Sequence, residues 1–298
     1  MKVAAEVFSS TPCQLGEAPV WSVPLQGLFW LDILQCRLYF RRPAEEAERV
    51  WALPCMCSAI FLLPGSQDEL LLASEQGLAR FGLVSGRFYI IAVTGDEAPD
   101  MRPNDAGIDP LGRIWFGTMQ KRPARHAGAL YSLEPGSGLR RHLAGVGIPN
   151  TLLWSPDGRS MIHADSLSKT IYRSSYEPES GTLSGSRVLV DLSAEGIDPD
   201  GSALDAEGCF WNAQWGGARV VCYDLDGREQ ARLDIPALQP SSCAFGGDEL
   251  ATLFVTSARV GLSDDELARY PLSGSVFRIS VERKGAPLPP CAMQSEGF

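Results

Sequence analysis

Six polar residues recur along the chain at matching distances from bulky apolar residues. Each lies 11 to 14 residues before an apolar residue at the centre of a predicted strand, and the six are Glu17, Ser58, Asn104, Asn150, Asp200 and Ser242. Two are carboxylates and two are amides, whose oxygens suit Ca²⁺, Mg²⁺ or Mn²⁺, with Zn²⁺ or Fe²⁺ also acceptable. Without a cation, converging Glu17 and Asp200 would repel each other. The spacing therefore predicts one divalent-metal site.

Turn formation is the other explanation for these polar residues. Asn and Asp favour turns because their side chains hydrogen-bond their own backbone. Glu17 does not fit this explanation, since it is a poor turn former and stands between Gly16 and Ala18-Pro19. We favour the metal site and keep turn formation as the alternative.

The elements that must position these residues form a sixfold repeat. Most of the chain consists of short apolar runs broken by Gly, Pro, Asp and Asn, which is typical of many short strands. Six strand centres follow at spacings of 42, 43, 47, 49 and 43 residues, at Trp30, Leu72, Trp115, Ile162, Trp211 and Phe254. Roughly 40–50 residues with four strands is the length of one propeller blade. A β-sandwich would not explain such near-constant spacing. The sequence predicts an all-β, six-bladed β-propeller with the metal site in its central channel.

The repeat fills the chain, so we expect a single domain over residues 1–298. The blades should occupy about residues 3–283, followed by a loose, proline-containing tail over residues 284–298. A strand around Val3 to Phe8 is expected to join the last blade, which removes an open sheet edge. Equivalent positions of a repeat occupy equivalent places, so the six polar residues should begin the innermost strands.

The composition excludes several classes of partner. A net charge of −10 disfavours nucleic-acid binding, which requires clustered Lys and Arg. No apolar run is long enough to span a bilayer, and Glu6 makes the N-terminus a poor signal peptide. Eight scattered cysteines then fit reduced thiols better than disulfides. We expect a cytoplasmic protein that is a monomer or a small homo-oligomer and binds neither nucleic acid nor membrane.

Several segments around the polar residues resemble the gluconolactonase / senescence-marker-protein family, also called regucalcin-like proteins. They are residues 15–21, 102–105, 117–119, 128–131, 148–150, 154–158, 200–201 and 242–247, in order and with compatible spacing. The resemblance implies a propeller that hydrolyses an aldonic-acid lactone, such as glucono-, xylono- or arabinonolactone, in sugar catabolism. It also implies Glu17, Asn150 and Asp200 as metal ligands, and Arg102 and Asn104 as substrate-binding residues.

Two departures from the family pattern affect the site. Thr151 follows Asn150 where the family usually has Gly, so the backbone there is less free. The loop after Met119 is short and basic, whereas some relatives have a longer loop with an acidic substrate-binding residue. Its cations, Lys121, Arg122 and Arg125, either select a lactone with a carboxylate, phosphate or sulfonate or form a solvated surface loop. Trp215 is a further candidate for the sugar pocket.

Lactone hydrolysis assigns roles to these residues. Water adds to the carbonyl, and a metal stabilises the charge on oxygen or lowers the pKa of the attacking water. We predict that Asp200 is the general base as well as a ligand, and that Arg102 and Asn104 hold sugar hydroxyls or the oxyanion. A serine hydrolase is disfavoured because no Gly-x-Ser-x-Gly elbow is followed by Asp and His. Two alternatives stay open: hydrolysis of other esters or phosphotriesters, and a calcium-binding propeller without activity.

Overall fold

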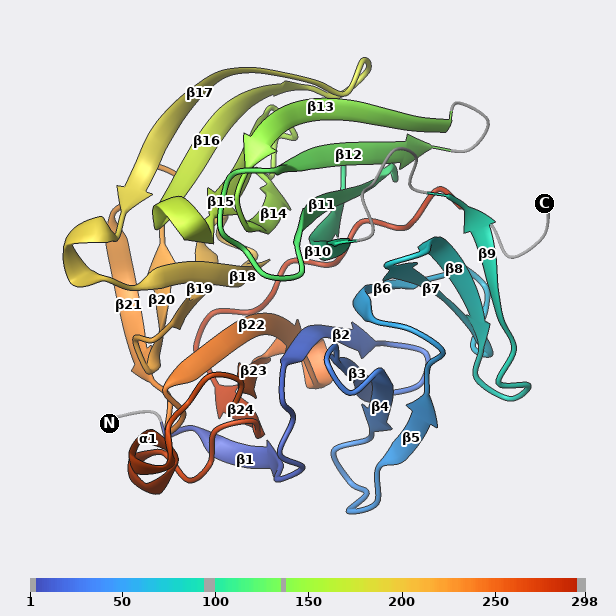
Figure 1. Cartoon of the computed structure of the whole chain (residues 1–298), viewed down its shortest axis with the longest axis vertical. Coiled ribbons are helices and arrows are strands. Elements are labelled where there is room, and N and C mark those ends of the chain that lie inside the picture. Colours follow the sequence, from blue (N-terminus) through green and yellow to red (C-terminus); the bar gives the residue numbers. More distant parts are fainter. Residues whose placement is uncertain (1–3, 94–99, 135–137, 294–298) are drawn as a thin grey trace. The chain divides into compact units, whose positions relative to one another are not determined.

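The computed structural model describes residues 4–93, 100–134 and 138–293. Regular structure in these residues is almost entirely β, in six four-stranded antiparallel sheets (Figure 1). Each sheet is one blade, and five of the six are formed by four consecutive strands. The predicted fold class, a six-bladed β-propeller, is confirmed.

The chain divides into two compact units of three blades each. Unit 1 comprises the described parts of residues 1–52 and 192–287, and unit 2 those of residues 53–191 and 288–298. Blades are numbered below in the order in which their first inner strands occur in the chain.

Unit 1 contains blades 1, 5 and 6. Blade 1 consists of β2 (Gly16–Ser22), β3 (Gly27–Asp32), β4 (Arg37–Arg41) and β5 (Arg49–Ala52). Blade 5 consists of β18 (Asp198–Leu204), β19 (Phe210–Trp215), β20 (Arg219–Tyr223) and β21 (Glu229–Asp234). Blade 6 consists of β22 (Gln239–Gly246), β23 (Thr252–Ala258), β24 (Val276–Ser280) and β1 (Glu6–Ser9). The pairing of β1 with β24 confirms that an N-terminal strand completes the last blade (Figure 1).

Unit 2 contains blades 2, 3 and 4. Blade 2 consists of β6 (Cys57–Leu62), β7 (Glu69–Ser74), β8 (Gly77–Gly82) and β9 (Phe88–Ala92). Blade 3 consists of β10 (Met101–Ile108), β11 (Ile114–Gln120), β12 (Gly128–Glu134) and β13 (Gly138–Val146). Blade 4 consists of β14 (Pro149–Trp154), β15 (Ser160–Asp165), β16 (Thr170–Glu177) and β17 (Thr182–Asp191).

Helical structure is limited to short connections. The 3₁₀ turns are η1 (Ser166–Ser168), η2 (Ser193–Glu195) and η3 (Asp248–Leu250), and the α-helix is α1 (Asp264–Arg269). Ser263 and Glu266 form a capping box that starts α1. Within the described ranges, no helix combines the length and the apolar character needed to cross a membrane.

In blade 1 the second strand is the most buried and the outermost strand the least. Every residue of β3 is buried, whereas β5 on the outside of the same sheet is exposed or half-buried. Within each unit, large side chains of neighbouring blades fill the space between the sheets. Trp211 contacts Phe245 edge to face in unit 1, and Trp115 contacts Trp154 in the same manner in unit 2. Buried contacts on both faces explain why inner strands have continuous apolar runs.

The segment after β24 is not the loose tail that the sequence predicts, at least as far as Met293. In unit 1, Gly285 forms a β-bridge with Asp205. In unit 2, Cys291 and Met293 are each only 3% exposed and belong to a hydrophobic core. The prolines of this segment do not prevent packing, because Cys291 and Met293, which follow them, bury their side chains. Residues 294–298 lie outside the described part of the chain.

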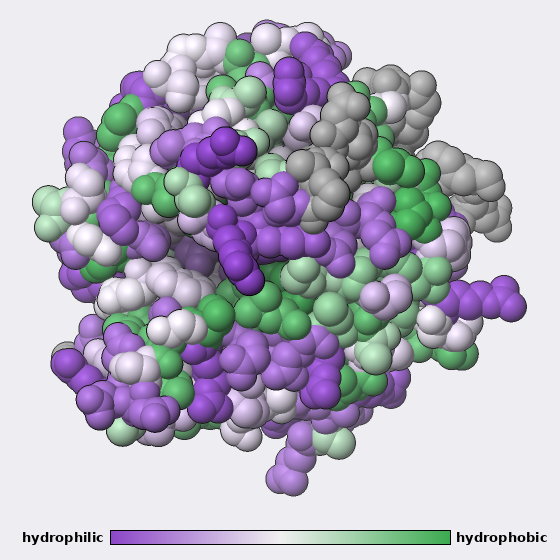
Figure 2. Space-filling model, viewed as in Figure 1, coloured by the Kyte–Doolittle hydropathy of each residue, from purple (hydrophilic) through white to green (hydrophobic). Residues whose placement is uncertain are grey.

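Several large apolar side chains are exposed at the surface. Val84 is 84% exposed and Leu288 is 64% exposed. In the face seen in Figure 2, hydrophobic residues are interspersed with hydrophilic ones. Exposed apolar residues are normal on protein surfaces.

Candidate active site

Each of the six innermost strands contains a β-bulge at or beside its predicted polar residue. The register shifts lie between Glu17 and Val20, Cys57 and Ala59, Pro103 and Ala106, Asn150 and Leu153, Pro199 and Ser202, and Pro240 and Ser242. A bulge leaves a residue out of the ladder and changes the direction of its side chain. The six polar residues therefore share one register near the start of the innermost strands.

Three candidate residues of unit 2 form a chain of hydrogen bonds. Arg102 Nη1 donates to Asn104 Oδ1 at 2.9 Å. Asn104 Nδ2 donates to Asn150 Oδ1 at 2.9 Å and to the carbonyl oxygen of Pro149 at 3.0 Å. Asn150 Nδ2 in turn donates to Ser166 Oγ at 2.8 Å. Arg102, Asn104 and Asn150 are all buried, so blades 3 and 4 bring them together in one network.

This network leaves an oxygen atom of Asn150 available to a cation. The amide NH₂ is engaged by Ser166, and Oδ1 accepts one hydrogen bond from Asn104. An amide oxygen has two lone pairs, so one remains for a ligand. Carbonyl oxygens of this type are ligands of hard divalent cations. The part of the predicted metal site that lies in unit 2 fits such an ion.

Glu17 and Asp200 belong to unit 1, in β2 and β18. Asp200 is buried and Glu17 is half-buried. Glu17 Oε2 accepts a hydrogen bond from the N–H of Ala18 at 3.1 Å. Asn212 on the neighbouring strand donates to the backbone oxygen of Asp200 at 2.8 Å and so supports the bulge. Both carboxylates have the chemistry that a divalent cation requires, and their sharing of one ion with Asn150 stays a prediction.

Thr151 and Ala18 occupy backbone conformations that favour glycine. Thr151 has φ +55° directly after Asn150, and Ala18 has φ +49° directly after Glu17. The left-handed region is unfavourable for residues with a Cβ, by roughly 1–2 kcal/mol. Thr151, where the sequence resemblance leads us to expect Gly, therefore lies at a position where the backbone is strained.

Asp105 is a site residue that the sequence analysis did not single out. Burial raises the pKa of its carboxyl to about 6, although hydrogen bonds from the backbone of Ala106, Thr151 and Leu152 act in the opposite direction. Only its place in the Arg-Pro-Asn-Asp segment could have drawn attention to it. Ser166 was also missed, because nothing in its sequence context indicates that it accepts a hydrogen bond from Asn150 in the same blade.

The basic loop after β11 is only partly free. Lys121 Nζ lies 2.7 Å from Glu75 Oε2, so its charge is compensated. Arg122 and Arg125 are exposed. Arg122 and Arg125 are the loop cations that stay accessible to a ligand.

Trp215 ends β19 in unit 1 and is half-buried. Its Nε1 donates a hydrogen bond to Gln239 Oε1 at 3.2 Å when the amide of Gln239 is oriented to satisfy its neighbours.

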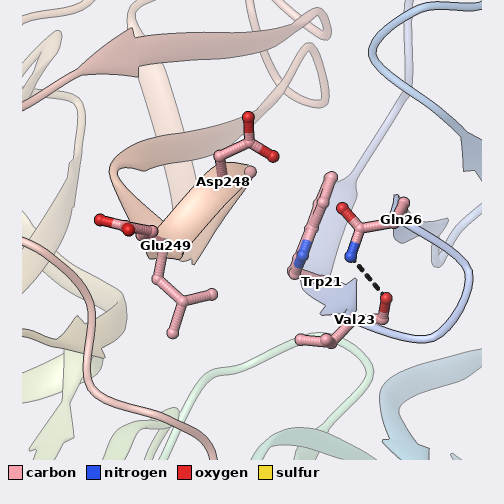
Figure 3. Close-up of a pocket in the computed structure, with 7 residues that line it drawn as sticks. Trp21, Val23, Gln26, Asp248 and Glu249 are labelled. Atoms are coloured by element: carbon pink, nitrogen blue, oxygen red, sulfur yellow. Dashed lines mark hydrogen bonds between the residues drawn. The ribbon is translucent and has the colours of Figure 1, made fainter.

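A surface groove of about 630 Å³ lies in unit 1 between blades 1 and 6. Its lining residues are Trp21, Val23, Gln26, Gly247, Asp248, Glu249 and Leu250. Figure 3 shows Trp21 between the acidic pair Asp248 and Glu249 on one side and Gln26 on the other. No predicted site residue lines this groove, so it is separate from the candidate active site.

A second set of possible metal ligands lies deep in blade 5. The ligand atoms of Asp205, Cys209 and Cys222 are within 4.8 Å of one another. However, Arg283 Nη1 lies 3.5 Å from Asp205 Oδ2 and 3.2 Å from Cys209 Sγ, so a cationic group already faces them. Burial also raises the pKa of both thiols, which disfavours the thiolates that a metal binds. This set is best explained as a structural cluster.

Comparisons with known proteins agree over most of the chain. Residues 15–259 match the family model described as the SMP-30/Gluconolactonase/LRE-like region. The chain is 38% identical over 284 residues to L-arabinolactonase of Azospirillum brasilense, covering 94% of this chain and 93% of the relative. It is 34% identical over 280 residues to 6-deoxy-6-sulfogluconolactonase of Pseudomonas putida, covering 93% and 95%.

A solved structure gives the same result for the fold. The crystal structure of a calcium-binding protein, regucalcin, from Agrobacterium tumefaciens strain C58 superimposes with a TM-score of 0.92 and 33% identity, covering 98% of both chains. Both the motifs around the bulges and the full-length similarity lead to one conclusion: the chain belongs to the SMP-30/gluconolactonase/LRE-like family.

Proposed function

We propose that the protein hydrolyses a sugar lactone to the open-chain aldonic acid, using one divalent cation bound by Glu17, Asn150 and Asp200. Lactonases among relatives that match more than nine-tenths of the chain support the reaction. The observation that carries the metal proposal is the Asn150 amide, which is fixed by Ser166 and Asn104 with an oxygen lone pair to spare. The calcium-binding regucalcin structure supports a divalent ion.

The identity of the cation is left to experiment among Ca²⁺, Zn²⁺, Mn²⁺, Mg²⁺ and Fe²⁺. Oxygen ligands discriminate weakly between these ions, and cellular availability contributes to the choice. When bound, the cation supplies a Lewis acid that stabilises negative charge on the lactone carbonyl oxygen.

The protein's own residues supply the proton transfer. The carboxylate of Asp200 accepts a proton from water as the water oxygen adds to the carbonyl carbon. The bond between that carbon and the ring oxygen then breaks, and the ring oxygen takes up a proton to become a hydroxyl group. Asp200 is the candidate to return the proton it has accepted, so the reaction consumes one water and leaves the enzyme unchanged.

Arg102 and Asn104 have different roles in this proposal. Both hydrogens of the Asn104 amide are donated within the protein, to Asn150 and to Pro149. Asn104 can therefore accept a hydrogen bond from a sugar hydroxyl but cannot donate one without breaking the network. Arg102, whose guanidinium is a donor only, is the proposed donor to the substrate. Because Arg102 is buried, its hydrogen bonds to a developing oxyanion should be strong.

Two substrate classes are distinguished by the basic loop. A neutral pentono- or hexonolactone requires no cation from it, and the arabinolactonase relative supports this class. An acidic lactone would use Arg122 and Arg125, since Lys121 is paired with Glu75. The sulfogluconolactonase relative favours testing this second class. We propose the neutral class first, because the two exposed arginines belong to a surface loop.

The test is a panel of lactones assayed with chelated protein and with each metal restored. We expect hydrolysis of at least one sugar lactone that is lost on chelation, recovered with one or more of the ions, and abolished by Asp200→Asn or Glu17→Gln. Asp157→Asn, in a surface turn of blade 4, is the matched control. Full activity after chelation would contradict the metal proposal.

The same panel separates the alternative functions. Equal or faster turnover of aryl esters or phosphotriesters would favour a different hydrolase. Cation binding without turnover of any ester or lactone would favour the calcium-binding propeller. A substrate range limited to anionic lactones, and lost in an Arg122→Ala/Arg125→Ala variant, would replace the neutral class by the acidic one.

A further inference from the structure

Asp105 connects the bulge of blade 3 to the bulge of blade 4. It follows Asn104 in β10, and its Oδ2 atom accepts a hydrogen bond from the backbone N–H of Thr151 in β14 at 2.8 Å. Its Oδ1 atom accepts from the N–H of Ala106 at 2.8 Å. The backbone N–H of Leu152 also donates to this carboxylate. One side chain thus accepts from two successive N–H groups of the neighbouring strand, where the ladder between β14 and β15 is interrupted.

Asn104 and Asp105 hold the β14 bulge on both sides of Asn150. Asn104 contacts the residue before it, through the carbonyl oxygen of Pro149, and the side chain of Asn150 itself. Asp105 contacts the residue after it, through the N–H of Thr151. The amide of Asn150 is therefore fixed by its own hydrogen bonds and by the backbone on either side.

The conformation that Asp105 supports is one that Thr151 does not favour. Thr151 has φ +55°, in the left-handed region where a β-branched side chain is uncommon. Strained backbone persists only where the surroundings fix it strongly. The carboxylate of Asp105 supplies such a restraint, because it accepts from the N–H groups of both Thr151 and Leu152, and an extended backbone at Thr151 would turn the Leu152 N–H away from it.

We propose that Asp105 is a positioning residue that holds the β14 bulge in the conformation in which Asn150 presents its oxygen to a cation. The inference rests on the proposed metal site and assigns Asp105 no contact with metal or substrate. Residues that orient metal ligands typically change metal affinity by 10- to 100-fold when they are replaced. A carboxylate suits this position because both of its oxygens accept hydrogen bonds, whereas an amide would turn its NH₂ group toward a backbone donor.

The first experiment measures Mn²⁺ binding to chelated protein through the electron paramagnetic resonance signal of free Mn²⁺. We expect Asp105→Ala to bind Mn²⁺ at least tenfold more weakly than the wild type. Hydrogen exchange of the metal-free proteins is measured beside it. The amides of Thr151 and Leu152 should exchange faster in the variant, while those of the buried strand β15 should not change.

A second substitution separates positioning from a general loss of structure. Glycine adopts a positive φ without strain, so Thr151→Gly in the Asp105→Ala background should recover part of the lost Mn²⁺ affinity. Thr151→Gly alone should change the affinity by less than threefold. Asp157→Ala is the matched control, because Asp157 also accepts a backbone N–H, that of Arg159, in the turn at the other end of β14. It should leave Mn²⁺ binding unchanged.

The outcomes separate the positioning role of Asp105 from the proposed metal site. Unchanged Mn²⁺ affinity in Asp105→Ala would overturn the role of Asp105 and leave the metal site intact. Weaker binding that Thr151→Gly does not recover, together with faster exchange throughout blade 4, would show that Asp105 serves only folding. If Asp105→Ala does not accumulate as folded protein, Asp105→Asn is measured in its place with the same expectations. A wild-type protein that binds no Mn²⁺ or other divalent ion would overturn the proposed metal site, and this inference with it.

Discussion

Blade 3 of unit 2 and blade 5 of unit 1 contain the same turn, built around a buried aspartate. Asp109 accepts hydrogen bonds from Trp115 Nε1 at 3.2 Å and from the N–H four residues later at 3.0 Å. Asp205 accepts from Trp211 Nε1 at 3.1 Å and from the equivalent N–H at 2.8 Å. A glycine with φ near +85° completes each turn. Two blades in different units therefore form the same turn with the same residue types.

The two turns differ in the cation that compensates the aspartate. In blade 3 it is local, because Arg113 Nε donates to Asp109 Oδ2 at 2.6 Å and both side chains are almost completely buried. In blade 5 the equivalent position is Cys209, and the cation is Arg283 from the segment after β24. The side chain of Arg283 is 27% exposed, and it also lies 2.7 Å from Glu207. The backbone of the turn sets what the aspartate must bind, but the counter-ion can come from a distant part of the chain.

The largest effect should come from removing the two aspartates. We expect Asp109→Ala to lower the free energy of unfolding by about 3–5 kcal/mol, since it leaves the guanidinium of Arg113 buried without its partner. Asp205→Ala should cost only about 1–3 kcal/mol, because Arg283 keeps Glu207 and reaches solvent. Urea unfolding followed by tryptophan fluorescence measures both. Equal losses would show that the source of the cation does not matter.

The repeated parts of this fold were predictable from the sequence. Trp115 and Trp211 stand at the centres of inner strands, where burial on both faces gives continuous apolar runs, and their spacing revealed the blades. The C-terminal segment was not predictable, because Cys291 and Met293 are buried by tertiary contacts that leave no periodic pattern. Arg283 was missed for the same reason, since its partner Asp205 lies 78 residues away in the sequence.

The candidate site was predictable to the extent that it follows the repeat. Counting back from the strand centres found Asn104 and Asn150, which the structure joins by a hydrogen bond. Asp105 and Ser166 could not be found in this way, because they act on the backbone or side chain of a neighbouring element rather than at the repeated position. The departure at Thr151 was visible in the sequence, but only the backbone angle shows that the threonine adopts the conformation suited to glycine.

The second prediction concerns the pH dependence of stability. It distinguishes the two units, because only unit 2 contains histidine. His142 stacks on Trp115 in blade 3 at 4.0 Å, and burial lowers its pKa from 6.5 to about 4. Burial lowers the pKa of His163 to about 4 as well. Below pH 6.5 the unfolded chain therefore binds protons that the folded protein does not, so stability is complete above pH 6.5 and falls as the pH approaches 4.

Replacing His142 measures how much of the pH dependence of stability comes from its side chain. The shift of the His142 pKa corresponds to at most about 3–4 kcal/mol, and roughly 2 kcal/mol is expected because the ring is only half-buried. His142→Phe should reduce the loss of stability between pH 7 and pH 4.5 by that amount, while His163→Phe should remove a separate part. Urea midpoints at several pH values test this. An unchanged slope in His142→Phe would mean that the ring is already protonated in the folded state.

The third prediction tests Arg283, the cation that pairs with Asp205 of blade 5 from the segment after β24. Arg283→Ala should destabilise the protein by about 1–2 kcal/mol, because Asp205 loses a partly exposed charged partner but keeps its donors from Trp211 and the backbone. The neighbouring Lys284→Ala is the control, since its ion pair with Glu249 is exposed and screened by solvent, so this variant should lose less stability than Arg283→Ala. A loss as large as that of Asp109→Ala would contradict the distinction between the two turns.

The smallest effect is expected when blade 5 is given the arrangement of blade 3. Cys209 occupies the position of Arg113, four residues after the aspartate, so Cys209→Arg in the Arg283→Ala background places a local cation beside Asp205. The guanidinium can use the space that Arg283 vacates, and we expect recovery of roughly 0.5–1 kcal/mol relative to Arg283→Ala alone. Unfolding in urea with an unchanged m-value is the measurement. A further loss would mean that the packing around Cys209 and Cys222, which are both buried, tolerates no side chain larger than a thiol. The two turns would then share a backbone conformation but differ in the side chains that can pack around the aspartate.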